Sequence, residues 1–341
     1  MKKLLTILLA LVMVFTFAAC GGGDTASNEG GEAPAETYEL MCASIYPVEH
    51  IDCTTLQAAF DNIEAKTNGG VKITLYPSNQ LGDYTQVYEE IMKGTIDMGA
   101  ITVPTNFDQR LEMLTLPFIT SSYDDAKVKF ASGSAFFDAC NGIQNELGVE
   151  MLGIFIEGYM GIGATKHIDN PMTVGTTHNE LLRVPAMDSY IWTAQGMGYN
   201  TTTIAYADLY AALQTGVCDG WIGGSAYVNY ESFRDVIKYY AETKYICELV
   251  PVVINKDLID GMPAEYSQAI REEMAAAAIT IADARDALDK QAIVDMGDMG
   301  IEIYECPEEE IQAMSDYFKE NVWPQYTDLL GEELLDVLIN G

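Results

Sequence analysis

The sequence predicts an α/β fold of two domains joined by one long bracing helix. Three observations carry this prediction. Segments with the periodicity of strands and of helices alternate along the chain. Its 341 residues exceed the usual size of one domain. The stretch 264–297 has helical character without an internal break, and at 1.5 Å per residue it would extend about 50 Å, more than the width of one small domain.

The N-terminal residues predict export from the cytoplasm. Two lysines precede an apolar run over 4–19, which is too short for a membrane span and typical of a secretion signal. Small residues stand directly before Cys20, so residues 1–19 resemble a bacterial lipoprotein signal peptide, with an ordinary signal peptide as the alternative. Residues 20–37 contain no large apolar side chain and should form a flexible tether. We therefore expect an extracytoplasmic protein that is anchored to the cell membrane by a lipid on Cys20.

Alternating apolar segments give the elements of the globular part. Strands are expected at 38–46, 71–76, 97–103, 149–156, 181–184, 250–255 and 301–304. Helices are expected at 54–67, 86–93, 189–197, 207–215 and 264–297, with amphipathic helices from Pro307 to the end. Gly94 should end the second of these helices, and Pro263 should precede the long one. This alternation is typical of a sheet rich in parallel strands.

Net charge excludes one class of partner. The chain carries 51 acidic and 18 basic residues, a formal net charge of −33. Such a surface repels phosphates, so nucleic acid is not expected to bind. Screening limits the field to roughly 8 Å at physiological ionic strength, so a few local basic groups can still bind an anionic solute.

The seven cysteines do not form a recognisable framework. Their spacing is irregular, and there is no CxxC pair. Most stand among apolar or small residues, which indicates reduced cysteines in the core, although a single disulfide stays open.

Motifs for catalysis are poorly represented. The three histidines, His50, His167 and His178, lack the spacing of metal ligands. Ser225 lacks the glycine that completes a nucleophile elbow, and the glycine-rich segment 158–166 fails the patterns of dinucleotide and phosphate loops. We interpret 158–166 as a crossover between domains. No catalytic residue, metal site or cofactor is therefore expected.

Arg183 is the residue with the strongest chemical signal. It lies inside the short apolar strand 181–184, and burying an unpaired guanidinium is costly. One interpretation is an ion pair with one of the many carboxylates of the chain. The other is that the planar guanidinium binds a ligand carboxylate with two hydrogen bonds at a strand end that faces a cleft.

Five segments, in order along the chain, form a recognisable set: Thr67–Gly70 with Tyr76–Gly82, Gly94–Gly99, Leu116–Phe118, Arg183–Pro185 and Asp208–Gly220. Together they resemble a known family, the extracytoplasmic solute receptors of tripartite ATP-independent periplasmic (TRAP) transporters. The resemblance implies a periplasmic-binding-protein-like flytrap of two α/β domains with a brace helix. It also implies that the receptor closes on its solute, that membrane subunits use an ion gradient for uptake, and that Arg183 holds the carboxylate.

On this resemblance, the two domains divide the chain unevenly. Residues 38–160 plus about 249–280 would form domain I. Residues 161–248 plus about 281–341, with the C-terminal helices, would form domain II.

The same resemblance identifies candidate pocket residues and a class of solute. The residues expected to line or approach the pocket are Arg183, Tyr46, Tyr84, Thr102, Met160, Tyr206, Trp221, Gly223 and Tyr245. Met160 stands where many relatives carry a second arginine, and Gly223 lies in a segment where relatives often carry an asparagine. We therefore hypothesise a monocarboxylate with an apolar or aromatic body, although each tyrosine alone fits a core position equally well.

Two other functions compete with this one. A receptor for an ATP-driven importer would share the flytrap fold, and a surface hydrolase or adhesin would need chemistry that the motifs do not supply. The expected partners are a small organic acid, integral membrane TRAP subunits and the membrane itself through the lipid at Cys20.

Overall fold

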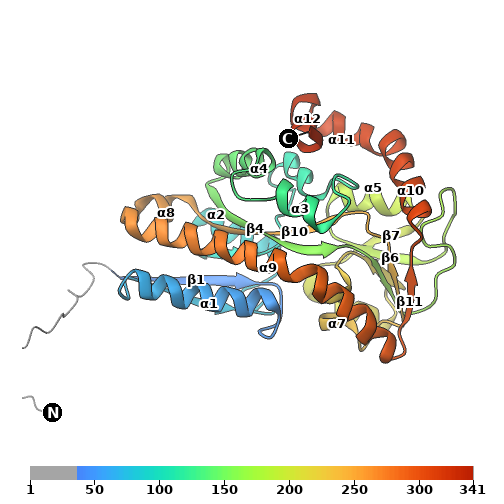
Figure 1. Ribbon diagram of the computed structural model, residues 1–341, viewed down its shortest axis with the longest axis horizontal. Coiled ribbons are helices and arrows are strands. Elements are labelled where there is room, and N and C mark those ends of the chain that lie inside the picture. The colour runs from blue at the N-terminus through green and yellow to red at the C-terminus, as the bar shows by residue number, and fades with distance from the viewer. Residues whose placement is uncertain (1–36, 341) are drawn as a thin grey trace, which may run out of the picture. The chain divides into compact units, whose positions relative to one another are not determined.

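The computed structural model of the chain describes residues 37–340 (Figure 1). The predicted signal peptide, the lipid attachment at Cys20 and nearly all of the tether lie outside the described residues. Within the described range, each helix is too short or too polar to cross a lipid bilayer.

Two sheets organise the described residues. The first contains, in spatial order, β2 (Val71–Tyr76), β1 (Tyr38–Ser44), β3 (Met98–Ala100), β10 (Cys247–Asn255) and β4 (Val149–Tyr159). The second contains β11 (Glu302–Glu305), β9 (Tyr239–Glu242), β5 (Ile162–Ala164), β8 (Gly220–Ile222), β6 (Leu181–Val184) and β7 (Asn200–Thr203). We call each sheet with its helices a lobe. The prediction of an α/β fold with two lobes is confirmed.

The strand directions agree with the expected parallel strands in part, because both sheets also contain antiparallel pairs, and β9 is parallel to β11. Strand β1 is parallel to β2 and β3, and β6 is parallel to β7 and β8, but β10 and β5 are antiparallel to both of their neighbours. The chain leaves the first sheet at the end of β4 and returns to it through β10. A returning strand that pairs with the departing one must run in the opposite direction, which makes the sheets mixed. The residue boundaries proposed for the two domains stay a prediction.

Helices cover the sheets and connect them. They are α1 (Ile51–Lys66), α2 (Tyr84–Lys93), α3 (Tyr123–Lys129), α4 (Ala135–Glu146), α5 (Asp188–Gly196), α6 (Leu209–Thr215), α7 (Ala226–Phe233), α8 (Lys256–Gly261), α9 (Ala264–Asp298), α10 (Glu308–Asn321), α11 (Trp323–Leu330) and α12 (Glu332–Asn340). Short 3₁₀ helices span Gln109–Thr115 and Tyr206–Asp208. The expected stop at Gly94 is confirmed, since this glycine caps α2 with a left-handed φ of 75°.

The 35-residue helix α9 is the predicted brace. It packs against α1 and β4 of the first lobe, and also against α7 and β11 of the second (Figure 1). Near its middle, the fully buried Arg285 donates hydrogen bonds to the Ile156 carbonyl at 2.9 Å and to Asp52 at 3.1 Å, and its Nη2 lies 3.1 Å from Glu157. One cation therefore ties α9 to α1 and β4.

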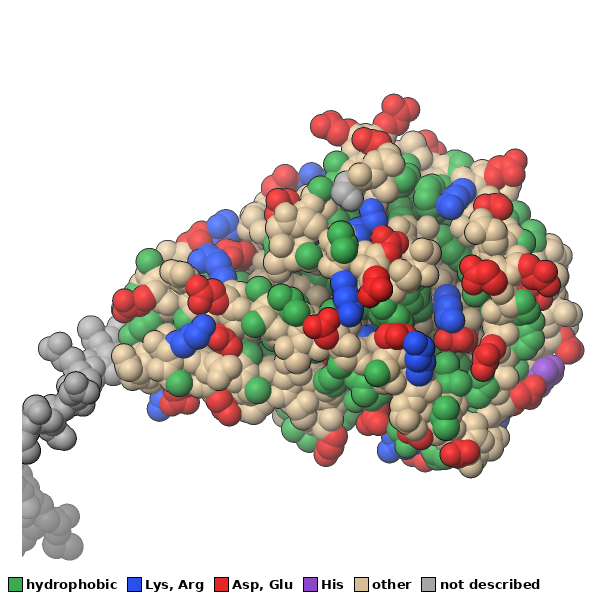
Figure 2. All heavy atoms as spheres, viewed as in Figure 1, with side chains coloured by type: hydrophobic (Ala, Val, Ile, Leu, Met, Phe, Trp, Pro, Cys, Tyr) green, Lys and Arg blue, Asp and Glu red, His purple; other side chains and the backbone are tan. Residues whose placement is uncertain are grey.

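Acidic and basic side chains are intermixed on the face shown in Figure 2. Among the described residues, Lys93 lies 2.8 Å from Glu89 within α2, and Lys256 lies 2.6 Å from Asp260 within α8. These surface cations are compensated locally by carboxylates of the chain itself, and each exposed pair contributes little to stability.

Cysteines in the described part of the chain are all free. Cys42, Cys53, Cys140, Cys218 and Cys247 are buried, and Cys306 is half-buried. The predicted reduced core cysteines are confirmed for the five buried positions, and Cys306 is free without lying in the core.

Replacing Arg285 by methionine should destabilise the protein by about 3–5 kcal/mol, because it leaves two buried carboxylates without their cation. Urea unfolding followed by circular dichroism measures this loss. Arg271→Met is the matched control on the same helix. Arg271 is 41% exposed and pairs with Glu150 at 2.6 Å, so its loss should cost about 1 kcal/mol or less. Equal losses for the two variants would contradict the role of Arg285 as the central tie.

Candidate functional site

A small cavity of about 20 Å³ lies where the two lobes meet, and we call it the Arg183 cavity. It is lined by Ile45, Tyr84, Thr102, Arg183, Pro185, Tyr190, Tyr206, Trp221, Ile222, Gly223 and Glu248. Tyr84 and Thr102 belong to the first lobe and Arg183 and Trp221 to the second, so the cavity is built from both.

Strand β6 aims Arg183 into this cavity. The strand lies between β7 and β8, and Arg183 pairs in register with Thr202 on one side and Trp221 on the other. The side chain is 3% exposed, and its Nε donates to the Ile204 carbonyl at 2.8 Å. The guanidinium centre also lies 5.8 Å from the centre of the Tyr206 ring. A backbone carbonyl therefore fixes the orientation of the guanidinium and leaves its far edge facing the cavity.

The Arg183 charge has no acidic partner among the described residues. Its buried Nη2 has no hydrogen-bond partner, and no ion pair joins it to a carboxylate in this part of the chain. Burial lowers the pKa of Arg183, while the hydroxyls of Tyr84 and Tyr190 act in the opposite direction. Of the two interpretations that the sequence allowed, the ion pair within the chain is therefore not formed here.

An aromatic wall stands beside the guanidinium. The Trp221 ring lies 6.1 Å from Tyr206 and 4.9 Å from Phe233 between ring centres, and its Nε1 donates to Asn229 at 3.0 Å. Gly223 has a φ of 145°, and a Cβ built there would lie 2.8 Å from the Trp221 ring. A residue with a side chain at this position would displace the Trp221 ring, so Gly223 allows this ring to occupy its observed place beside Tyr206.

Glu248 is a cavity residue that sequence reasoning missed. It lies on β10 at a register irregularity between β10 and β4, opposite Gly158. Its Oε2 is buried without a hydrogen-bond partner. Burial, with Glu157 as the next cause, raises the pKa of Glu248 to about 8. An acid inside the apolar segment of β10 is the same kind of signal that singled out Arg183, so the sequence did contain a clue.

The structure brings together some of the predicted pocket residues and not others. Those that line the cavity are Tyr84, Thr102, Arg183, Tyr206, Trp221 and Gly223. Tyr46 instead stacks on His50 with ring centres 4.1 Å apart, and the Tyr245 hydroxyl lies 3.3 Å from the Met160 sulfur in the buried region where the chain crosses between lobes. Tyr46, Met160 and Tyr245 are buried in the core and are not part of the cavity lining. A role in ligand binding stays a prediction for all nine residues.

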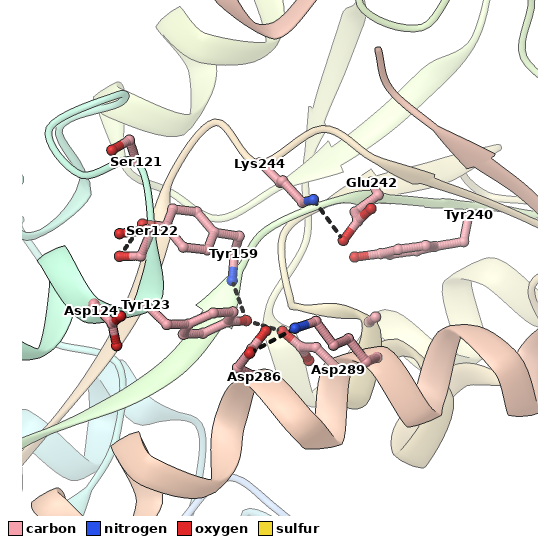
Figure 3. Close-up of a pocket in the computed structure, with 12 residues that line it drawn as sticks. Ser121, Ser122, Tyr123, Asp124, Tyr159, Tyr240, Glu242, Lys244, Asp286 and Asp289 are labelled. Carbon is pink, nitrogen blue, oxygen red and sulfur yellow. Dashed lines mark hydrogen bonds and ion pairs between the residues drawn. The ribbon is translucent and has the colours of Figure 1, made fainter. Parts of the chain in front are cut away.

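A larger pocket of about 300 Å³ is a weaker candidate for binding an acid. Figure 3 shows its lining, in which the hydroxyl of Tyr123 donates to Asp289 on α9. Its two lysines already have partners, since Lys244 lies 3.2 Å from Glu242 and Lys290 lies 2.8 Å from Asp286. With these cations paired inside the chain, the pocket offers a carboxylate no counterpart to the Arg183 guanidinium.

One buried cluster has the geometry of metal ligands. Atoms of His50, Asp52 and Glu157 lie within 4.8 Å of one another, and all three residues are fully buried. However, Arg285 lies 3.1 Å from both carboxylates and supplies the positive charge that a metal ion would bring. Burial lowers the pKa of His50 to about 4, and His50 Nδ1 accepts a hydrogen bond from the backbone of Asp52 at 3.3 Å. The cluster is therefore an internal ion network at the start of α1.

Comparison with known proteins gives a consistent result. Residues 43–328 match the family described as bacterial extracellular solute-binding protein, family 7. A solute-binding protein of Chromohalobacter salexigens is 29% identical over 67% of this chain and 68% of its own length. The ectoine/5-hydroxyectoine-binding periplasmic protein UehA of Ruegeria pomeroyi is 24% identical over 79% of this chain and 78% of its own length.

Solved structures show the same fold. A TRAP periplasmic solute-binding protein from Desulfovibrio salexigens with bound orotic acid matches with a TM-score of 0.79 and 18% identity, over 89% of this chain and 96% of its own. The sugar acid binding protein DctPAm from Advenella mimigardefordensis, in complex with galactonate, matches with a TM-score of 0.82 and 14% identity, over 89% and 97%. The predicted two-domain flytrap with a long brace helix is thereby confirmed.

Replacing His50 by asparagine should reduce the loss of stability at acidic pH. The folded His50 takes up a proton only near pH 4, whereas the unfolded chain does so near the ordinary value of 6.5. Between these values a falling pH favours the unfolded state, by roughly 3 kcal/mol over the window. We expect the free energy of unfolding to fall more for the wild type than for His50→Asn as the pH is lowered from 7 to 4. Urea unfolding of both proteins across this pH range measures the difference.

His167→Asn serves as the control for this prediction. His167 is exposed, and the hydrogen bond that its ring donates to Asp169, followed by the one to Glu302, raises its pKa. A histidine whose pKa is raised by folding stabilises the folded state at a pH below its ordinary pKa, and this stabilisation is lost as the pH rises. His167→Asn should therefore not protect the protein against acid. A stability gap for His50→Asn that is constant from pH 4 to 6.5 would show that His50 does not carry the effect.

Proposed function

Because this chain belongs to the bacterial extracellular solute-binding proteins of family 7 and is an extracytoplasmic TRAP solute receptor, we propose that it captures a small organic acid through Arg183. One observation carries the proposal, namely that Arg183 lines the cavity while its buried Nη2 has no hydrogen-bond partner in the described part of the chain. A ligand carboxylate would supply the missing acceptor and neutralise the charge. The family match favours this role over an ATP-driven importer receptor or a surface hydrolase.

Ligand binding should favour the closed arrangement of the lobes. The cavity lining includes Tyr84 from the first lobe and Arg183 from the second, so a bound solute would contact both. A ligand shifts a conformational equilibrium by its difference in affinity between the two states. The present cavity of about 20 Å³ accommodates roughly one water molecule, so a solute of several carbon atoms would enter only when the lobes move apart. Closure would then present the loaded receptor to the membrane subunits.

The solute that best fits the lining is a monocarboxylate with an apolar or aromatic body. Arg183 is the basic residue of the lining, and Tyr84, Tyr190, Tyr206 and Trp221 surround it. One guanidinium matches one carboxylate, and aromatic side chains stack on flat or apolar groups. The Desulfovibrio protein with bound orotic acid supports a ring-bearing acid, whereas the Advenella protein with galactonate supports a hydroxylated one.

Arg183→Lys and Arg183→Gln should each lower carboxylate affinity at least about tenfold, because a charge-assisted bidentate contact contributes roughly 1.5–3 kcal/mol. A thermal-shift screen against aliphatic, aromatic and sugar acids would first identify a ligand, which calorimetry on wild type and variants would then quantify. Arg234→Lys is the matched control, since Arg234 also lies over a tyrosine ring, 4.9 Å from Tyr230, but does not line the cavity. Unchanged affinity in both Arg183 variants would remove this residue from the site.

We further propose that a lipid on Cys20 holds the receptor at the membrane. The supporting feature is the apolar run over 4–19 that ends in small residues before this cysteine. Cys20→Ser should abolish incorporation of radiolabelled palmitate and move the protein from the membrane to the soluble extracytoplasmic fraction. Membrane retention without label in the variant would point to an uncleaved signal peptide instead.

A further inference from the structure

Glu248 lines the same cavity as Arg183. One of its carboxylate oxygens, Oε2, has no hydrogen-bond partner among the described residues, although the backbone of Gly224 donates a hydrogen bond to the carboxylate. Both side chains line the cavity, and both hold a buried polar atom without a hydrogen-bond partner, Oε2 of Glu248 and Nη2 of Arg183. No ion pair joins these two described residues, although the Arg183 charge acts through space to lower the pKa of Glu248. The cavity therefore presents an unused donor and an unused acceptor at separate points.

The backbone directs Glu248 into the cavity. In the pairing of β10 with β4, Glu248 lies opposite Gly158 and Leu249 lies opposite Ile156, so Glu157 is the extra residue. A bulge of this kind redirects side chains on the two strands. Here Glu157 lies in the ion network with Arg285, while Glu248 lines the cavity. The acid at the cavity is thus placed by the geometry of the two strands that cross between the lobes.

We infer that Glu248 is a specificity residue, which accepts a hydrogen bond from a hydroxyl or ammonium group carried by the solute in addition to its carboxylate. This inference rests on the proposed function, because it takes the carboxylate at Arg183 as given. A buried acceptor without a partner loses the hydrogen bonds that water would supply, and a solute donor restores one of them. The substrate class is therefore a hydroxy or amino monocarboxylic acid.

Glu248 also discriminates against a second acidic group. At a pH above the Glu248 pKa of about 8, a dicarboxylate with one group on Arg183 would bring its other group toward an ionised side chain, and like charges in a poorly hydrated site repel strongly. A solute that carries a hydroxyl or ammonium group in place of the second carboxylate would donate a hydrogen bond to Glu248 instead. The same residue thus favours one class of acid and disfavours another.

Calorimetry with two matched sets of acids tests the inference on the purified full chain. The first set is butyrate, 2-hydroxybutyrate and 2-aminobutyrate, and the second is 3-phenylpropionate, 3-phenyllactate and phenylalanine. In at least one set, a member with a donor should bind about tenfold more tightly than the unsubstituted acid. Glu248→Met should remove this preference in either case.

Glu248→Gln distinguishes the two kinds of donor while keeping the shape of the side chain. Its amide oxygen still accepts from a hydroxyl, so a preference for the hydroxy acid should persist, whereas a preference for the amino acid should fall at least about tenfold with the lost charge. Glu242→Gln is the control, since Glu242 is on the neighbouring lobe at 3.2 Å from Lys244 and does not line the cavity. It should bind all six acids as wild type does.

Two results separate the failure of this inference from that of the proposed function. Equal affinity within both sets in wild type, or a preference that Glu248→Met leaves intact, would overturn the role of Glu248 while carboxylate binding stands. Acid binding that is undiminished in Arg183→Gln, or undetectable for all six acids in wild type, would overturn the proposed function and the inference with it. Wild-type affinity for the unsubstituted acid in Glu248→Gln shows that the variant has kept its fold.

Discussion

The arrangement of the two lobes depends on a buried cation, the guanidinium of Arg285. It lies on the brace helix α9 and contacts carboxylates on α1 and β4 as well as a backbone carbonyl of β4. Buried charges are tolerated only when their partners are well placed, so the network restricts how α9 can lie against the first lobe. The same helix also contacts α7 and β11 of the second lobe. The position of the cleft between the lobes follows from this restriction.

Arg183 is buried almost as completely as Arg285, but among the described residues its charge lacks the ion pairs that Arg285 has within the chain. Arg285 is surrounded by carboxylates, while Arg183 has one backbone acceptor and an unpartnered edge. An unpaired buried charge lowers stability, and its presence beside a cavity is the basis for our proposal that a ligand completes the site. Glu248 repeats the pattern with an acceptor. Arg285 has ion pairs within the chain, whereas Arg183 and Glu248 line the cavity without one in the described range, which is why we propose the latter two as the recognition groups.

Long periodic segments were the part of the fold that could be predicted. The strand Val71–Tyr76 and the helix α9 were found nearly to the residue, because periodicity over many residues is informative. Strands β5 and β8, with three residues each, were missed, since so short a segment has no measurable period. Their strand character arises from pairing with neighbours that are distant in sequence. The antiparallel direction of β10 likewise depends on where the chain returns, which local pattern does not encode.

The sequence by itself predicted the alternating elements, an export signal and a role for Arg183, because each prediction depends on residues adjacent along the chain. The tertiary structure alone decided which groups share the cavity. It placed Glu248 and Tyr190 in the lining and left Tyr46 and Met160 outside. These positions depend on one register irregularity and on the packing of two lobes, both of which involve residues far apart in sequence. Burial and pairing are properties of the folded molecule, so the unpaired state of Arg183 could be recognised only there.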